Sequence, residues 1–409
     1  MPSRLLRMSG RNPGESHRAA TPLELLFDLS FVVAFGQAAD QLSHAIAEQH
    51  TAIGLGGFAF TMFAICWAWI NFSWFASAFD TDDWFYRLTT FVQMIGVIVL
   101  ALGIPPLFAS LLAGAHPDNA VIVAGYVIMR VAMVVQWARV AREDPAHRRT
   151  ALTYIAYVLV AQVGWVTLAL LDVPAATFVM LALVLYAIEL GGPIVAERRV
   201  GGTPWHPHHI AERYGLLAII ALGEGVFGTV ASVAALVSHQ GWSLDAALVV
   251  FAGIGITFGL WWTYFILPSG AVLARHRSRG FVWGYGHILI YAAIAATGAG
   301  LHVVAYVIEG TSEIGTVGAI LAIAIPVLGF SIVNFALYGY LVRQWDPLHS
   351  VLFAGTVLTL VAAVALAAAG ASLAVCLVIV TLSPAVVIVG FETFGHRHQA
   401  RMLQQVLGD

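Results

Sequence analysis

The chain has 409 residues, of which 60% are hydrophobic and only 10% are charged, and its formal net charge is −3. A soluble globular protein carries about 25% charged residues, so this chain has too few charges to cover its surface in water. The composition excludes an ordinary soluble protein and predicts one whose solvent is the lipid bilayer.

The chain begins with a polar, arginine-rich segment, residues 1–20. It lacks the apolar core and the small-residue cleavage site of a signal peptide, so the first apolar stretch is expected to remain as an anchor. A helix needs about 20 mostly apolar residues to cross a bilayer, and its backbone groups must bond within the segment. We therefore predict an all-α, polytopic transmembrane helical bundle of about 12 helices. The predicted helices are 22–48, 51–78, 85–112, 119–141, 149–171, 174–195, 209–238, 243–268, 281–308, 313–341, 347–369 and 371–391.

Proline and glycine mark irregular points within this series. Pro105 and Pro106 are expected to end or break the third helix. Gly255 and Gly259 are one turn apart and favour close packing of the eighth helix against a neighbour. The break between the last two helices is expected near Gly370.

The arginines give the predicted orientation. With the N-terminus inside, the arginines that follow the first segment fall at inner helix ends or inner loops, except Arg130 in mid-membrane, and the outer loops contain none. Basic residues are retained on the cytoplasmic side of a membrane. We therefore predict that both termini are cytoplasmic.

An internal repeat is also predicted. Residues 25–37 align with 212–224, with Ala34 over Ala221 and Gly36 over Gly223. An even number of helices in each half gives a parallel repeat of two six-helix halves. The predicted domains are a cytoplasmic Arg-rich segment at 1–20, a first half at 21–195, a cytoplasmic linker at 196–208, a second half at 209–391 and a cytoplasmic tail at 392–409.

Four polar residues are expected at mid-membrane depth, where ionisable groups are costly and often functional. They are Gln37, Asp40, Arg130 and Glu224. We hypothesise that Arg130 pairs with Glu224, with Asp40 or Gln37 completing a substrate or ion pathway. The alternative is a structural ion pair that fixes helix register.

A second polar cluster is expected at the cytoplasmic end. Its predicted members are Glu24, Asp28, Asn71, Asp80, Asp82, Asp83, Arg87, Glu189, His209, Glu212 and Arg213. Thr81 or Asp82 is the expected cap of the third helix, because both residue types suit a helix start. The alternative interpretation of the cluster is a cation-binding or gating network at the inner mouth.

Other chemistry is not indicated. The run WHPHHIAE at 205–212 has spacings that suit a metal ion, but a solvated interfacial start to the seventh helix is the better explanation, so no metal site is predicted. The two cysteines, Cys66 and Cys376, lie in apolar runs. We find no phosphate-binding loop, no catalytic motif, no cofactor signature and no basic aromatic surface for nucleic acid.

Three motifs together resemble the bacterial low-temperature-requirement protein A (LtrA) family: LELLFDLSFVVAF at 23–35, FDTDD at 79–83 and HIAERYGLLAIIALGE at 209–224. The resemblance implies a multi-pass inner-membrane protein associated with growth in the cold. It implies no particular substrate. The motif positions are Glu24, Phe27, Asp28, Phe79, Asp80, Asp82, Asp83, His209, Glu212, Arg213, Gly223 and Glu224. Gly225 departs from the small polar residue expected after the glutamate.

The leading functional prediction is a secondary transporter or permease for an unknown substrate, coupled to protons through Glu224 or Asp40. The alternatives are an intramembrane enzyme that acts on a lipid or lipid-linked substrate, and a membrane scaffold or sensor. The expected partners are the lipid bilayer and a small-molecule or lipid substrate, and the oligomeric state stays open.

Overall fold

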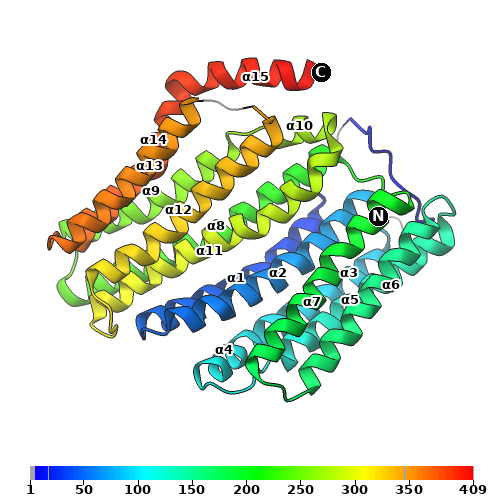
Figure 1. Ribbon diagram of the computed structural model, residues 1–409, viewed down its shortest axis with the longest axis horizontal. Coiled ribbons are helices and arrows are strands. Elements are labelled where there is room, and N and C mark those ends of the chain that lie inside the picture. The colour runs from blue at the N-terminus through cyan, green and yellow to red at the C-terminus, as the bar shows by residue number, and fades with distance from the viewer. Residues whose placement is uncertain (1–4, 17, 345–346, 409) are drawn as a thin grey trace. The chain divides into compact units, whose positions relative to one another are not determined.

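The computed structural model describes residues 5–16, 18–344 and 347–408, and every regular element within these ranges is a helix (Figure 1). Helices of the first part of the chain are α1 (Pro22–Ala47), α2 (Thr51–Phe79), α3 (Trp84–Leu102), α4 (Ile104–Leu112), α5 (Ala120–Glu143), α6 (Arg148–Leu170), α7 (Ala175–Val195) and η1 (Ala196–Val200). Those of the later part are α8 (Pro207–Gln240), α9 (Leu244–Phe265), α10 (Ser269–Arg275), η2 (Arg277–Arg279), α11 (Gly280–Glu309), α12 (Thr316–Val342), α13 (Pro347–Ala368), α14 (Leu373–Gly390), η3 (Phe391–Gly395) and α15 (His396–Gly408).

Twelve helical spans in the described residues are long and apolar enough to cross a membrane. This confirms the predicted all-α, multi-pass architecture. The predicted irregular points are also found. Gly103 separates α3 from α4, with Pro105 and Pro106 in the first turn of α4, where proline is tolerated. Gly370, with φ of +85°, lies in the turn between α13 and α14, and glycine adopts this conformation without strain.

The C-terminal segment contains a helix that was not predicted from the sequence. Residues 392–409 were expected only as a tail, whereas His396–Gly408 form α15. Its buried residues, Gln399, Met402 and Val406, recur at helical spacing and form one face. Gln399 Nε2 donates to the backbone oxygen of Ile266 at 3.0 Å, so α15 docks against the end of α9.

The helices fall into two compact units. The first comprises residues up to Gln37 together with Phe63–Arg213, and the second comprises Ala38–Met62 together with residues from Tyr214 onward. The boundary therefore falls within α1, α2 and α8. The two six-helix halves and their repeat stay predictions.

Small residues bring helices close together in each unit. In the first, a Cβ on Gly96 of α3 would lie 2.7 Å from the backbone oxygen of Gly125 in α5. In the second, a Cβ on Gly255 of α9 would lie 2.7 Å from Thr381 Cγ2 of α14, and one on Gly259 would also overlap α14, at Pro384. The predicted close packing of the Gly255 and Gly259 face is thus confirmed. Packing of this kind holds helices together where lipid removes the hydrophobic driving force.

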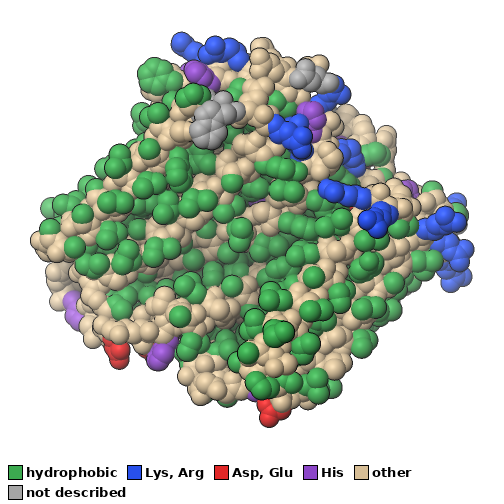
Figure 2. All heavy atoms as spheres, viewed as in Figure 1, with side chains coloured by type: hydrophobic (Ala, Val, Ile, Leu, Met, Phe, Trp, Pro, Cys, Tyr) green, Lys and Arg blue, Asp and Glu red, His purple; other side chains and the backbone are tan. Residues whose placement is uncertain are grey.

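The outer surface of the helices is apolar. Large side chains such as Met180 and Leu358 are both 69% exposed, and Figure 2 shows hydrophobic side chains along the flanks of the helices with arginines gathered at helix ends. Exposed apolar area of this extent marks contact with a membrane. The chain is therefore a multi-pass membrane protein.

Candidate functional site

The start of α1 is fixed by a capping box. Thr21 Oγ1 accepts a hydrogen bond from the Glu24 amide at 3.2 Å, and the Glu24 carboxylate accepts one from the Thr21 amide at 2.7 Å. Reciprocal bonds of this kind are typical of a helix start. Glu24 is completely buried in the first unit, so the cap also places a carboxylate inside the protein.

The first turns of α8 bring two basic side chains to α1. Arg213 Nη1 lies 3.0 Å from Glu24 Oε1, and Arg213 Nη2 donates to Asp28 Oδ1. Trp69 Nε1 donates to the same Asp28 oxygen at 2.7 Å, and His209 Nε2 lies 3.2 Å from Glu24 Oε1. His209 and Arg213 are one turn apart and so share a face of α8. The structure thus brings four members of the predicted cytoplasmic cluster together.

Arg18 extends this network to the loop after α2. Its Nη2 lies 3.7 Å from Glu24 Oε1 and 3.5 Å from Asp80 Oδ2, and it donates to the backbone oxygen of Ala76 at 3.1 Å. Burial, together with the charge of Glu24, raises the pKa of Asp80 to about 6. Asp80 therefore binds a proton more readily than an exposed aspartate does.

The charges of this network do not balance. We call it the inner charge network, and its members are Arg18, Glu24, Asp28, Asp80, His209 and Arg213. Three carboxylates face two guanidinium groups, so with a neutral imidazole the network carries a charge of −1. An uncompensated buried charge is costly, and one bound proton would make the network neutral. The network is therefore suited to hold one exchangeable proton.

Neighbouring acidic residues have other roles. Asp83, and not Thr81 or Asp82, caps α3, because its Oδ1 accepts the Tyr86 amide at 2.9 Å. Although burial opposes it, the ion pair with Arg139 lowers the pKa of Asp83.

The remaining predicted members of the cytoplasmic cluster lie outside the inner charge network. Asp82 pairs with Arg87 at 2.7 Å in the first turn of α3. Asn71 donates to the backbone oxygen of Trp67, and Glu212 is exposed.

The pairing expected for Arg130 is corrected by the structure. Its partner is Glu189 of α7, with Arg130 Nη2 2.8 Å from Glu189 Oε2, so Glu189 takes the place expected for Glu224. Trp67 Nε1 donates to the same oxygen at 2.8 Å. Glu189 had been assigned to the cytoplasmic cluster from the sequence. The position of a residue along its own helix does not show which neighbouring helix its side chain faces. Both charged side chains are buried in the first unit.

Glu224 lies in the second unit, in the middle of α8, and is only 3% exposed. Within the described part of this unit no side chain donates a hydrogen bond to it or forms an ion pair with it. Asp40 of α1 is near enough to repel its charge. The backbone of α11 packs directly against it, since a Cβ on Gly298 would lie 2.6 Å from Glu224 Cβ. A buried carboxylate in this setting needs a proton or another cation.

Polar groups lead from Asp40 toward the C-terminal ends of α1 and α11. His44 Nδ1 lies 3.5 Å from Asp40 Oδ1, and Tyr306 Oη of α11 lies 3.2 Å from His44 Nε2. His302, one turn before Tyr306, is within electrostatic reach of Asp40 and His44. Asp40 and His44 are about half exposed, with side-chain values of 44% and 50%. We call Asp40, His44, Glu224, His302 and Tyr306 the Asp40–Glu224 cluster.

Gln37, the fourth residue of the predicted pathway, is partly exposed on α1 and belongs to the first unit. The structure thus brings Asp40 and Glu224 together, and it places Arg130 with Glu189.

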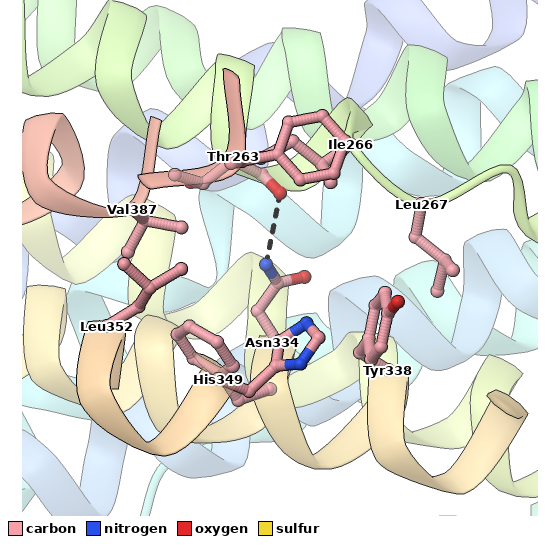
Figure 3. Close-up of a pocket in the computed structure, with 10 residues that line it drawn as sticks. Thr263, Ile266, Leu267, Asn334, Tyr338, His349, Leu352 and Val387 are labelled. Carbon is pink, nitrogen blue, oxygen red and sulfur yellow. Dashed lines mark hydrogen bonds between the residues drawn. The ribbon is translucent and has the colours of Figure 1, made fainter. Parts of the chain in front are cut away.

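A small cavity lies between the ends of α9, α12, α13 and α14 in the second unit (Figure 3). Asn334 Nδ2 donates to the backbone oxygen of Thr263 at 3.2 Å, shown by the dashed line. Thr263 is in the last turn of α9, where carbonyls lack helical donors. Because its volume of about 40 Å³ suits only water-sized molecules, we interpret this feature as a helix cap.

The histidine run before α8 binds protein groups. His206 Nε2 lies 2.8 Å from the backbone oxygen of Glu15, and its Nδ1 lies 3.2 Å from the His209 amide. Among the described residues, no group of three or more His, Cys, Asp or Glu side chains is arranged to hold a metal ion.

Sequence reasoning missed several residues of these sites. Arg18 belongs to the inner charge network, Trp69 donates to Asp28 of that network, and His302 with Tyr306 extends the Asp40–Glu224 cluster. A sequence signal existed for the capping box, the pattern Thr-x-x-Glu at 21–24. No local pattern connects α11 to α1.

Comparison with known proteins gives a consistent family assignment. The family described as "Bacterial low temperature requirement A protein (LtrA)" matches residues 19–384. An uncharacterized protein of Rhizobium meliloti (strain 1021), RA0937, is 27% identical over 296 residues, which cover 68% of this chain and 67% of that protein. No solved structure matches the chain significantly.

Proposed function

Since the chain belongs to the bacterial low temperature requirement A (LtrA) family, we propose that it is a secondary transporter coupled to protons. It would act in the bacterial inner membrane on a small-molecule substrate.

The observation that carries this proposal is the environment of Glu224. The side chain is 3% exposed in the middle of α8, and the carboxylate of Asp40 is near enough to repel its charge. A carboxylate that cannot stay charged without a cation is suited to bind and release a proton as its surroundings change. The half-exposed Asp40 and His44 offer a way for protons to reach it.

The inner charge network supports the same proposal. Its unbalanced charge gives a second place for one exchangeable proton, near the helix ends that carry the arginines. The positive-inside pattern of those arginines supports a cytoplasmic location for both termini. Coupled transport needs groups that exchange protons with each side of the membrane, and both clusters contain carboxylates and histidines that serve this purpose in the proposal.

The test uses purified full-length protein in liposomes under an imposed pH gradient. We expect the wild type to carry protons when pooled cell extract is added. We expect Glu224→Gln, which removes the titrating group but keeps its size, to abolish that flux. Asp245→Asn is the control, because Asp245 is exposed in the first turn of α9 and belongs to neither cluster.

Proton flux that persists in Glu224→Gln would refute coupling through this residue. The absence of flux in the wild type under every condition would favour the two alternatives, a lipid-acting enzyme or a scaffold. A changed lipid profile in a deletion strain would then identify the enzyme.

The family description also supports a role at low temperature. Cooling stiffens lipid and slows helix movement, so a transporter becomes more limiting in the cold. We expect a deletion strain to grow normally in the warm and poorly in the cold. Equal growth at both temperatures would contradict this part of the proposal.

A further inference from the structure

The second unit contains an apolar groove of about 480 Å³. The end of α1 and the first turns of α2 form one wall, and α11 with α12 form the other. Its lining includes Leu42, Leu55, Phe58, Ala296, Gly318 and Gly329. This volume is in the range that holds a small ligand.

The groove is open along its side. Leu55 and Ile325, which both line it, are 50% and 63% exposed. Because these helices cross the membrane, the open side faces the hydrocarbon of the bilayer. Small residues keep the groove hollow: a Cβ added to Gly329 would meet no atom within 4 Å.

One end of the groove is closed by the turns that join its helices. The Glu313 amide donates to the Ala47 oxygen at 2.9 Å, and Gln49 Nε2 donates to the Glu313 oxygen at 3.0 Å. Ser312 Oγ donates to the Ala47 oxygen at 3.2 Å. These bonds fix the α1–α2 turn to the α11–α12 loop, so a ligand enters from the side.

The closed end is acidic. Glu48, Glu309 and Glu313 are exposed there, and His50 lies 4.0 Å from Glu48. The arginines of this unit lie at the opposite ends of the same helices, as at Arg279 before α11. Figure 2 shows acidic and histidine side chains at the closed end on the face in view. Such an end attracts a cationic headgroup and repels an anionic one.

We propose that this groove binds one acyl chain of a membrane lipid whose headgroup carries an ammonium group, such as phosphatidylethanolamine. The chain lies between α2 and α12, and the ammonium group lies beside Glu48 and Glu313. This inference goes beyond the proposed transport function and does not depend on it, because lipid binding is measured without transport.

The test measures retained lipid by native mass spectrometry. Full-length protein is purified in mild detergent with equal amounts of dioleoyl-phosphatidylethanolamine and dioleoyl-phosphatidylglycerol. We expect the wild type to retain the former about fivefold more strongly, as expected for one favourable charge interaction near the membrane surface. Equal retention of the two lipids would overturn the headgroup assignment.

Two groove variants test the site itself. Gly329→Leu fills the groove and is expected to lose the retained lipid, whereas Gly329→Ala adds one methyl group and is expected to lose part of it. Gly56→Leu is the control, because Gly56 also has open space around it but does not line the groove. Thermal unfolding of each variant reports whether it is folded. If Gly329→Leu does not fold, the lipid retained by Gly329→Ala tests the groove. Wild-type retention in both Gly329 variants would overturn the proposal.

The charges at the closed end are tested by the double variant Glu48→Gln and Glu313→Gln. The backbone of Glu313 makes the closing bonds, so the side-chain change leaves them in place. We expect this variant to retain lipid but to lose its preference for phosphatidylethanolamine. An unchanged preference would show that these carboxylates do not select the headgroup.

Discussion

At the scale of single residues, the ion pair of Arg130 with Glu189 is the clearest stabilising contact inside the first unit. Removing one partner leaves a buried charge, so we expect Glu189→Gln to lower the free energy of unfolding by about 3–5 kcal/mol. Replacing both residues by leucine should cost much less, because no charge is then left unpaired. Unfolding in detergent measures both effects. A double variant as unstable as the single one would show that the pair does more than balance charge.

Asp80 predicts a pH dependence of stability. Its folded-state pKa of about 6 lies above the usual value near 3.9 for aspartate. Between about pH 4 and pH 6 the unfolded chain therefore loses its proton first, and the free energy of unfolding falls as the pH rises through this window. We expect Asp80→Asn to raise the melting temperature at neutral pH and to leave it unchanged near pH 4. A lower melting temperature of Asp80→Asn than of the wild type at neutral pH would contradict the predicted direction of this effect.

Residue pairing is the part of the sites that the sequence could not supply. The structure places Glu24, Asp28, His209 and Arg213 in contact, and their depth and face follow from helical spacing. Arg130 was given the wrong partner, because depth does not show which helices touch. Glu189 was not considered as a partner of Arg130, because it had been assigned to the cytoplasmic cluster, and only the contact between α5 and α7 shows the pairing.

At the scale of elements, the N-terminal segment is held by acidic side chains at the helix ends. The Gly10 amide donates to Asp144 Oδ2 at 2.8 Å, and the Met8 amide donates to Glu143 Oε2 at 2.6 Å. Although burial opposes it, the bonds from Gly10 and His147 lower the pKa of Asp144. A carboxyl group with a lowered pKa stabilises the fold above its unfolded-state pKa and loses this contribution as the pH falls through its folded-state pKa.

We therefore expect Asp144→Asn to release the segment at neutral pH. The chain has no lysine, so trypsin cuts only after arginine, and faster cleavage after Arg7 and Arg11 reports the release. Asp172→Asn is the control, because the Asp172 side chain is 95% exposed. Equal cleavage rates in the two variants would show that Asp144 does not hold the segment.

The helices themselves were largely predictable, because bilayer thickness sets the length of each apolar run. The helix breaks at Gly103 and Gly370 also follow from residue type. Proline cannot continue a helix without losing a backbone hydrogen bond, and glycine adopts the positive φ of a turn without strain. The helix α15 was missed because its sequence is polar overall and was treated as a tail. A sequence signal was present, since Gln399, Met402 and Val406 recur at helical spacing and form its buried face.

At the scale of the whole molecule, the distribution of arginine predicts which loops are cytoplasmic. Cys66 and Cys376 are both buried, so a single new cysteine at a loop provides the only accessible thiol among the described residues. In right-side-out vesicles, we expect an impermeant maleimide to label Asp118→Cys and Thr311→Cys at outer loops. Arg148→Cys lies at the start of α6, which the arginine pattern predicts to be cytoplasmic, and should react only after the membrane is opened. An odd number of spans between these two loops would reverse the labelling of Thr311→Cys relative to Asp118→Cys, because each helix crossed inverts the side. Labelling of both positions in intact vesicles would therefore support a cytoplasmic N-terminus and an even number of spans between the two loops, and the absence of labelling at either position would refute the predicted orientation.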